Sequence, residues 1–151
     1  MTRHAVVELT DLHALLNDVV SIYRGTTGNV ELRTRFAPSL PQVFVDPAKI
    51  HQVMRNVINN ALEAMAGDGH IDIETQHLAA ANRVRIVVAD EGPGIPAEAH
   101  DKLFLAHYST KRRGSGVGLA IVRRIIDEHG GRIEICDNTP RGTRFAIELP
   151  C

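Results

Sequence analysis

The stretch DPAKIHQVMRNVINNALEAM, residues 46–65, predicts the clearest helix of the chain. Asp46 suits the N-cap because its carboxylate can accept the exposed N–H groups of a first helical turn. Pro47 suits the first helical position, where no backbone donor is needed. Apolar residues then recur at helical spacing and form one stripe, until glycines interrupt the pattern. The sequence therefore predicts a helix over 46–66 with one buried side.

Similar patterns on either side of this helix predict the remaining elements. Helical spacing predicts helices over 9–24 and 116–129 and a short helix over 97–104. Alternating patterns predict strands at 30–36, 43–45, 70–76, 83–90, 132–136 and 143–149. Because these strands are mostly amphipathic, helices should cover one face of the sheet and leave the other nearer solvent. We therefore expect an α/β two-layer sandwich, with a mixed β-sheet covered on one face by about three helices.

Length and composition indicate one globular domain, which we expect to span residues 1–151. The chain has 151 residues, of which 44% are hydrophobic and 23% are charged. A net charge of −1 gives no basis for broad electrostatic binding to nucleic acid or to an anionic membrane. Aromatic residues make up only 4%, which disfavours a base-stacking surface. We therefore expect no nucleic-acid partner.

Targeting signals and cysteine usage both indicate a cytoplasmic protein. No apolar run approaches the roughly 18–20 residues of a membrane span, and no signal peptide is visible. Cys136 and Cys151 lack the spacing of metal ligands. We expect both to be reduced thiols, with Cys136 as a small core residue.

The non-core side of the 46–66 helix carries Asn56, Asn60 and Glu63 at positions i, i+4 and i+7. Asparagine is unfavourable inside a helix because its side chain competes for backbone hydrogen bonds. Asn56, Asn59 and Asn60 together therefore suggest a functional reason. An amide oxygen is a suitable ligand for Mg²⁺, which prefers oxygen donors. Taken alone, the pattern also fits a polar, solvent-facing side.

The sequence DEGPGIP, residues 90–96, follows a strand of Val and Ile. Gly92 and Gly94 permit a tight turn and a close approach of the backbone to a base. The Asp90 carboxylate accepts hydrogen bonds, and an exocyclic amine such as adenine N6 could donate one. D-x-G-x-G is a weak motif by itself, and a plain turn residue is the alternative.

A glycine-rich block, GSGVG at residues 114–118, runs directly into an apolar helix. Exposed N–H groups at a helix start favour phosphate. The block is not a Walker motif, and it is not the dinucleotide fingerprint, since Leu119 or Ile121 stands at the third glycine position. The preceding residues 105–115 are expected to form an exposed loop in which Lys111 could contact phosphate and which could close as a lid. A flexible cap and a solvated basic loop are the alternatives.

Together these blocks resemble the catalytic, ATP-binding domain of bacterial sensor histidine kinases, within the ATPase group of DNA gyrase B and MutL. The resemblance covers nearly the whole chain. It rests on similarities to the asparagine box, the first glycine box, the phenylalanine box, the second glycine box and the last box, at NVINNA (56–61), DEGPGI (90–95), LFLAHYSTK (103–111), GSGVGLAIV (114–122) and PRGTRF (140–145). The short STK–RRGSG connection looks most like the nitrogen-regulation type.

The resemblance implies a Bergerat-type fold that binds Mg-ATP. Asn60 would bind Mg²⁺, Asn56 would support the metal and phosphates, and Asp90 would read adenine N6. Lys111, with the backbone around 116–118, would hold the β- and γ-phosphates, so that the implied catalytic residues are Asn56, Asn60 and Lys111. The other nucleotide-binding residues that it implies are Glu63, Ala64, Gly92, Gly94, Ile95, Phe104 (at the lid hinge), Tyr108, Ser109, Thr110, Gly114, Ser115, Gly116, Val117, Gly118, Leu119 and Thr143 (near adenine).

The resemblance also implies a reaction class. In gyrase-like ATPases a glutamate one turn before the metal-binding asparagine activates water, whereas this chain has Asn56 there. A neutral amide cannot act as a general base, so hydrolysis should be slow. The domain is expected to position ATP for another nucleophile, a histidine on a separate dimerisation and phosphotransfer domain. The chain departs from the family pattern at two places. Leu105–Tyr108 differ from the usual lid sequence, and Glu63 stands where many relatives carry Lys or Arg.

None of the eight histidines lies in a phosphoacceptor context, so we expect the dimerisation and phosphotransfer hairpin to be absent from this chain. The response regulator would interact through that separate domain, and the catalytic domain alone is expected to be monomeric. Whether the parent kinase is anchored in a membrane stays open. The alternatives are an anti-sigma-type serine protein kinase, a nucleotide-dependent regulatory binding module of the same fold, and a true ATPase.

Overall fold

The computed structural model describes residues 6–65, 67–94, 116–138 and 141–151, with residues 116–118 described by backbone alone. Its helices are α1 (Leu12–Tyr23), α2 (Pro47–Ala64) and α3 (Gly116–Glu128), with a 3-10 turn at Ala79–Ala81. Its strands are β1 (Glu8–Thr10), β2 (Asn29–Arg35), β3 (Val43–Val45), β4 (Asp68–Leu78), β5 (Arg83–Ala89), β6 (Arg132–Asp137) and β7 (Thr143–Pro150). The expected short helix over 97–104 and loop over 105–115 lie outside the described residues.

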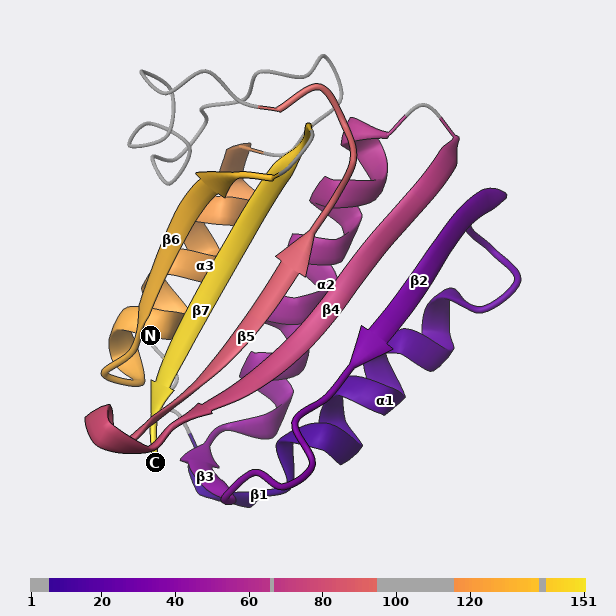
Figure 1. Cartoon of the computed structure of the whole chain (residues 1–151). Coiled ribbons are helices and arrows are strands. Elements are labelled where there is room, and N and C mark those ends of the chain that lie inside the picture. The colour runs from indigo at the N-terminus through magenta and orange to yellow at the C-terminus, as the bar shows by residue number, and fades with distance from the viewer. Residues whose placement is uncertain (1–5, 66, 95–115, 139–140) are drawn as a thin grey trace.

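The main sheet has five strands in the order β2-β4-β5-β7-β6. β2 pairs with β4 in parallel, and the other neighbours are antiparallel, so the sheet is mixed. All three helices lie behind this sheet and cover one face (Figure 1). Buried residues of the helices and of the inward strand positions, among them Ile58, Ile73 and Phe145, form one core between the layers. The expected two-layer sandwich is confirmed.

The helix α2 begins as its sequence predicts. Asp46 Oδ1 accepts the N–H groups of Ala48 and Lys49, at 3.1 and 3.3 Å. The same residue joins α2 to α3, because its own N–H donates to His129 Nε2 at 3.0 Å. His129 Nδ1 lies 2.7 Å from the carbonyl oxygen of Ile125. An imidazole that donates through Nδ1 and accepts through Nε2 is neutral, so this link depends on the uncharged histidine.

Replacing His129 with alanine should therefore destabilise the domain. The buried Asp46 would lose the acceptor of its N–H group, at a cost of about 1–3 kcal/mol. Urea unfolding at pH 7.5 measures the change, and His77→Ala, at an exposed position of β4, is the matched control. Equal stability of the two variants would contradict a structural role for the link.

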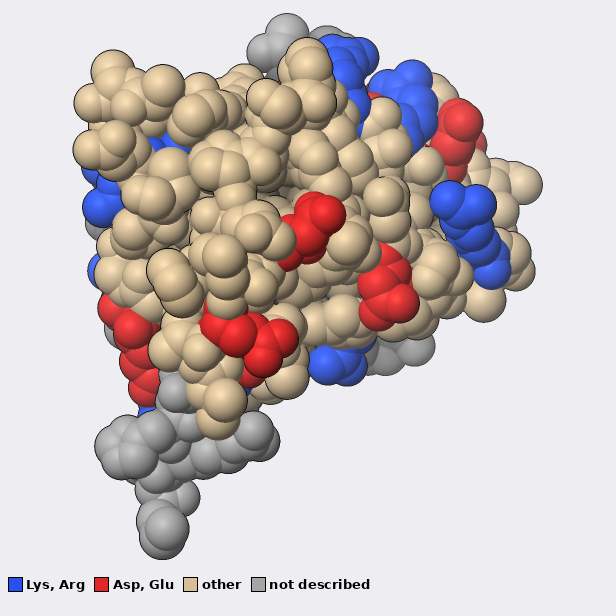
Figure 2. Space-filling view, turned by 90° about the horizontal axis from the view of Figure 1, so that it is seen from below, with Lys and Arg blue, Asp and Glu red and all other residues tan. Residues whose placement is uncertain are grey.

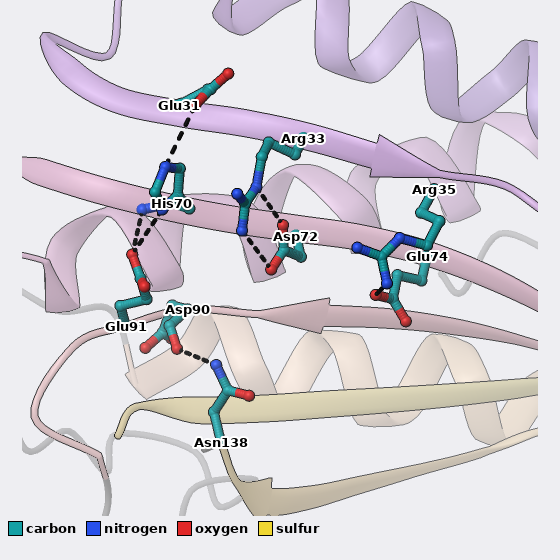
Figure 3. Close-up of polar contacts among 9 residues, drawn as sticks. All are labelled: Glu31, Arg33, Arg35, His70, Asp72, Glu74, Asp90, Glu91 and Asn138. Carbon is teal, nitrogen blue, oxygen red and sulfur yellow. Dashed lines mark hydrogen bonds and ion pairs between the residues drawn. The ribbon is translucent and has the colours of Figure 1, made fainter. Parts of the chain in front are cut away.

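The open face of the sheet carries rows of paired charges where β2 runs beside β4. The parallel register places Glu31, Arg33 and Arg35 opposite residues 70, 72 and 74. Arg33 bonds Asp72 at 2.7 Å, which raises the pKa of the guanidinium, and Arg35 lies 3.4 Å from Glu74 (Figure 3). These alternating polar positions leave this face to solvent, as the amphipathic strands predicted.

The predicted strand at 43–45 is confirmed as β3, but its pairing with β1 in a small antiparallel ribbon was not predicted. The expected helix over 9–24 starts only at Leu12, after its N-cap Asp11, and residues 8–10 pair with β3 instead. Leu9 lies opposite Phe44, and these side chains are 52% and 70% exposed. The ribbon lies at the lower end of Figure 1, and Figure 2 shows that end as a mostly uncharged surface with scattered charged side chains.

The prediction for Cys136 is wrong. Both cysteines are free thiols, but Cys136 is exposed. β6 is an edge strand, and its alternation places Ile133 and Ile135 against the core, so Cys136 shares the outer face with Glu134. Within the described part of the chain, no helix is long and apolar enough to cross a membrane.

Candidate functional site

Asp90 lies directly after β5 and is only 1% exposed. Its Oδ1 accepts two backbone N–H groups, from Gly92 at 2.8 Å and from Thr143 at 3.1 Å. The bond to Gly92 is that of an Asx turn, so Asp90 has the turn role that was considered as the alternative. Because two donors converge on one oxygen, the direction of the carboxylate is fixed.

The β6–β7 hairpin holds the backbone of Asp90 as well. The Asp90 N–H donates to the carbonyl oxygen of Thr143 at 2.9 Å. The Asn138 Nδ2 donates to the carbonyl oxygen of Asp90 at 2.7 Å (Figure 3). Gly142 packs so closely that a Cβ atom there would lie 2.0 Å from this same oxygen. The structure thus brings the predicted residue Thr143 directly beside Asp90.

The turn after Asp90 packs onto the end of α2. A Cβ atom at Gly92 would lie 2.8 Å from the carbonyl oxygen of Ala64 and 3.0 Å from its Cβ. Glycine is therefore required at position 92 because the backbone of Ala64 lies so close. At Gly94 the reason is a φ of +85°, which favours glycine. Ala64, Gly92 and Asp90, all predicted as nucleotide-binding residues, lie together at this end of α2.

The asparagines of α2 separate into two groups. Asn59 Oδ1 accepts the Tyr23 hydroxyl at 2.9 Å and so joins α2 to α1. Burial raises the pKa of the Tyr23 phenol, which keeps it protonated as a donor. Asn56 and Asn60 are half-buried, and Glu63 is exposed. The cost of Asn59 within the helix is thus explained by its contact with α1.

The remaining predicted residues are described in part or not at all. α3 begins at Gly116, and Leu119 on its first turn is 5% exposed in the core. The side chains of residues 116–118 are not described. The predicted residues that lie outside the described part of the chain are Ile95, Phe104, Tyr108, Ser109, Thr110, Lys111, Gly114 and Ser115.

A cavity of about 530 Å³ adjoins the turn. It is lined by residues Ala64, Met65, Asp68, Gly69, Glu91, Gly92, Pro93 and Arg141. Glu91 points away from Asp90, to the open face, where its Oε1 accepts the N–H of His70 and lies 3.2 Å from Nδ1 of the same residue (Figure 3). Arg141 donates from Nε to the carbonyl oxygen of Gly92 at 3.0 Å.

Three features around the turn were not predicted from the sequence: Asn138, Arg141 and the contact between Glu91 and His70. Arg141 lies inside the last box, PRGTRF, so its position was a usable signal. Asn138 and His70 fall outside every motif, and nothing local in the sequence marks them. Each is brought to the turn by strand pairing, β6 with β7 and β4 with β5.

Comparison with known proteins identifies the family of the chain. The model of the family "Histidine kinase-, DNA gyrase B-, and HSP90-like ATPase" matches residues 45–151. The sensor histidine kinase ZraS of Escherichia coli K12 is 32% identical over an alignment of 149 residues that covers 97% of this chain and 32% of ZraS. The sensory histidine kinase/phosphatase NtrB of Klebsiella oxytoca is 39% identical over 163 residues, covering 98% of this chain and 45% of NtrB. The chain thus spans less than half the length of these relatives.

Solved structures show the same fold. The nucleotide-free catalytic domain of the histidine kinase ThkA has a TM-score of 0.82 at 32% identity and covers 96% of this chain and 95% of its own. Full-length ShkA in complex with AMPPNP has a TM-score of 0.87 at 27% identity and covers 99% of this chain and 32% of its own. The chain therefore belongs to the histidine kinase-, DNA gyrase B- and HSP90-like ATPase family, with the fold of a histidine kinase catalytic domain.

Proposed function

We propose that this domain binds Mg-ATP and positions the γ-phosphoryl group for transfer to a histidine on a separate dimerisation and phosphotransfer domain. The observation that carries the proposal is the buried carboxylate of Asp90, oriented by two N–H groups at the end of the asparagine-bearing helix. Family membership supports it, as does the AMPPNP bound by the relative ShkA.

The geometry of Asp90 suggests how the base is read. A carboxylate oxygen has two lone pairs in its plane, and Oδ1 already accepts from Gly92 and Thr143. We therefore assign recognition of the exocyclic amine of adenine to this oriented carboxylate. Gly92 and Ala64 offer a small, close-packed wall beside this carboxylate.

The donor chemistry on α2 fits Mg²⁺. Asn60 supplies a neutral amide oxygen, a donor that Mg²⁺ accepts together with water and phosphate oxygens. The half-buried Asn56, one turn earlier, would support the phosphates. Glu63 on the following turn would repel them unless the cation lies between. When bound, the cation would neutralise negative charge on the phosphates, and this charge would otherwise oppose transfer of the phosphoryl group.

The same helix disfavours water as the acceptor. Asn56 stands where a gyrase-like ATPase carries a general base, and an amide cannot take a proton at neutral pH. We therefore place the phosphoryl acceptor on another domain. We propose a response regulator as the next partner, and we place the catalytic domain in the cytoplasm. The ThkA relative has been solved in complex with the response regulator TrrA, which supports the second partner.

Titration calorimetry with ATP, in the presence and absence of Mg²⁺, tests this proposal. Asn60→Ala should weaken Mg-ATP binding by about tenfold and leave metal-free binding nearly unchanged, because one metal ligand is lost. Asn59→Ala is the matched control, since its amide bonds Tyr23 on α1. Failure of the unaltered domain to bind any adenine nucleotide would refute the proposal. Transfer of labelled phosphate to an added phosphotransfer domain would extend it to the reaction.

A further inference from the structure

We infer that Asn138 is a positioning residue for the carboxylate of Asp90 and thereby helps to set the preference for adenine over guanine. The inference rests on the proposed function, because it assumes that Asp90 reads the base. Asn138 belongs to none of the sequence motifs and directly follows β6.

Asn138 connects two backbone segments that are distant in sequence. Its Nδ2 donates to the carbonyl oxygen of Asp90 at 2.7 Å, and its backbone N–H donates to the carbonyl oxygen of Gly142 at 3.0 Å. One end of the residue thus closes the β6–β7 turn while the other end holds the turn after β5. Figure 3 shows the Asn138 side chain directed from the hairpin toward Asp90.

The carbonyl that Asn138 holds belongs to the peptide that starts the Asx turn. Rotation of this peptide would move Gly92, whose N–H orients Asp90 Oδ1 at 2.8 Å. A bond to the Asp90 carbonyl therefore restricts the carboxylate as well. Two further contacts from the described part of the hairpin to Asp90, through the N–H and the carbonyl oxygen of Thr143, involve backbone atoms of Thr143. The bond from Asn138, in contrast, comes from a side chain and can be removed by substitution.

A fixed carboxylate is what base discrimination requires. A buried acceptor that bonds an amine rejects an analogue with a carbonyl at the same place, because two acceptors would then face each other unpaired. The rejection weakens if the carboxylate can turn aside. Loosening Asp90 should therefore reduce ATP affinity more than GTP affinity, whereas a general loss of stability should lower both.

The experiment measures ATP and GTP affinities of Asn138→Ala, Asn138→Asp and Asn138→Ser by calorimetry. We expect Asn138→Ala to lose about tenfold in ATP affinity and to change little toward GTP. Asn138→Asp has the same shape but cannot donate when ionised, and should lose at least as much. Asn138→Ser keeps a hydroxyl donor, should recover part of the loss, and serves as the test if the alanine variant does not fold.

Asn59→Ala is the control, because it removes a side-chain hydrogen bond of 2.9 Å at a different contact. It should lower the midpoint of thermal unfolding and leave the ratio of ATP to GTP affinity unchanged. An unchanged ratio in folded Asn138→Ala and Asn138→Asp, in a domain that binds ATP, would overturn the inference alone. No ATP binding by the unaltered domain would overturn the proposed function and this inference with it.

Discussion

Replacement of Gly142 by alanine should lower the midpoint of thermal unfolding by roughly 10 °C and remove nucleotide binding. Gly142 has a φ of +108°, which a residue with a Cβ rarely adopts, and that Cβ would lie 2.0 Å from the carbonyl oxygen of Asp90. The β6–β7 hairpin must therefore move away from the turn. Strain and lost contacts should cost roughly 3 kcal/mol, and about 2–4 °C per kcal/mol is typical of a domain of this size.

Gly25→Ala separates the two contributions to this effect. Gly25 also has a positive φ, +75°, but a Cβ atom there would meet nothing within 4 Å. Its substitution should cost about 1 kcal/mol through backbone strain alone and leave nucleotide binding intact. Calorimetric melting of both variants, followed by ATP titration, makes the comparison. A Gly142 variant no less stable than the Gly25 variant would contradict the close contact with Asp90.

Asp90→Asn should reduce ATP affinity by roughly 100-fold while the domain stays folded. The asparagine keeps an oxygen that can accept from Gly92 and Thr143, so the turn should persist. Its second position, however, becomes an N–H donor, which would face the donating amine of adenine. A charge-assisted hydrogen bond would thus be replaced by an opposed pair of donors.

Titration with ATP and GTP, together with thermal unfolding, distinguishes this outcome from misfolding. Affinity for GTP should fall less than affinity for ATP, because an N–H group can donate to the guanine carbonyl. Thr75→Val provides a comparison at another buried hydrogen-bonding side chain, which accepts the N–H of Ala37 far from the turn. ATP binding by folded Asp90→Asn at full affinity would mean that another residue reads the base.

Local patterns in the sequence were sufficient to predict α2. Asp46 and Pro47 specify where this helix starts, and the apolar stripe specifies the side that is buried. The strand β1 was not predicted in this way, although the strand at 43–45 was. The helical spacing expected over 9–24 included residues 9 and 10, and β1 is stabilised by a partner that lies more than 30 residues further along the chain.

The residues of the candidate site that belong to sequence motifs could be predicted. Residues that reach the site only through the pairing of strands could not. Asp90, Gly92, Ala64 and Thr143 come together as the resemblance implied, although their roles stay predictions. Asn138 could not be found, since its contact to Asp90 depends on where the β6–β7 hairpin meets β5. The alternation in RIEIC places Cys136 with Glu134 on the outer side of the strand. The prediction of a core position rested instead on the apolar neighbours of Cys136 and was therefore wrong.

The bond between Asp46 and His129 has a mechanical consequence for the whole molecule. It pins the first residue before α2 to the residue that follows α3, at the ends of these helices remote from the Asp90 turn. A tilt of α2 about this bond would displace the helix least at Asp46 and most at Ala64. The 18 residues of α2 span about 27 Å, so a tilt of about 5° moves the far end by about 2 Å. Because the turn after Asp90 packs on the Ala64 end of α2, a change in the tilt of this helix would alter distances at the candidate site far more than at the Asp46 end.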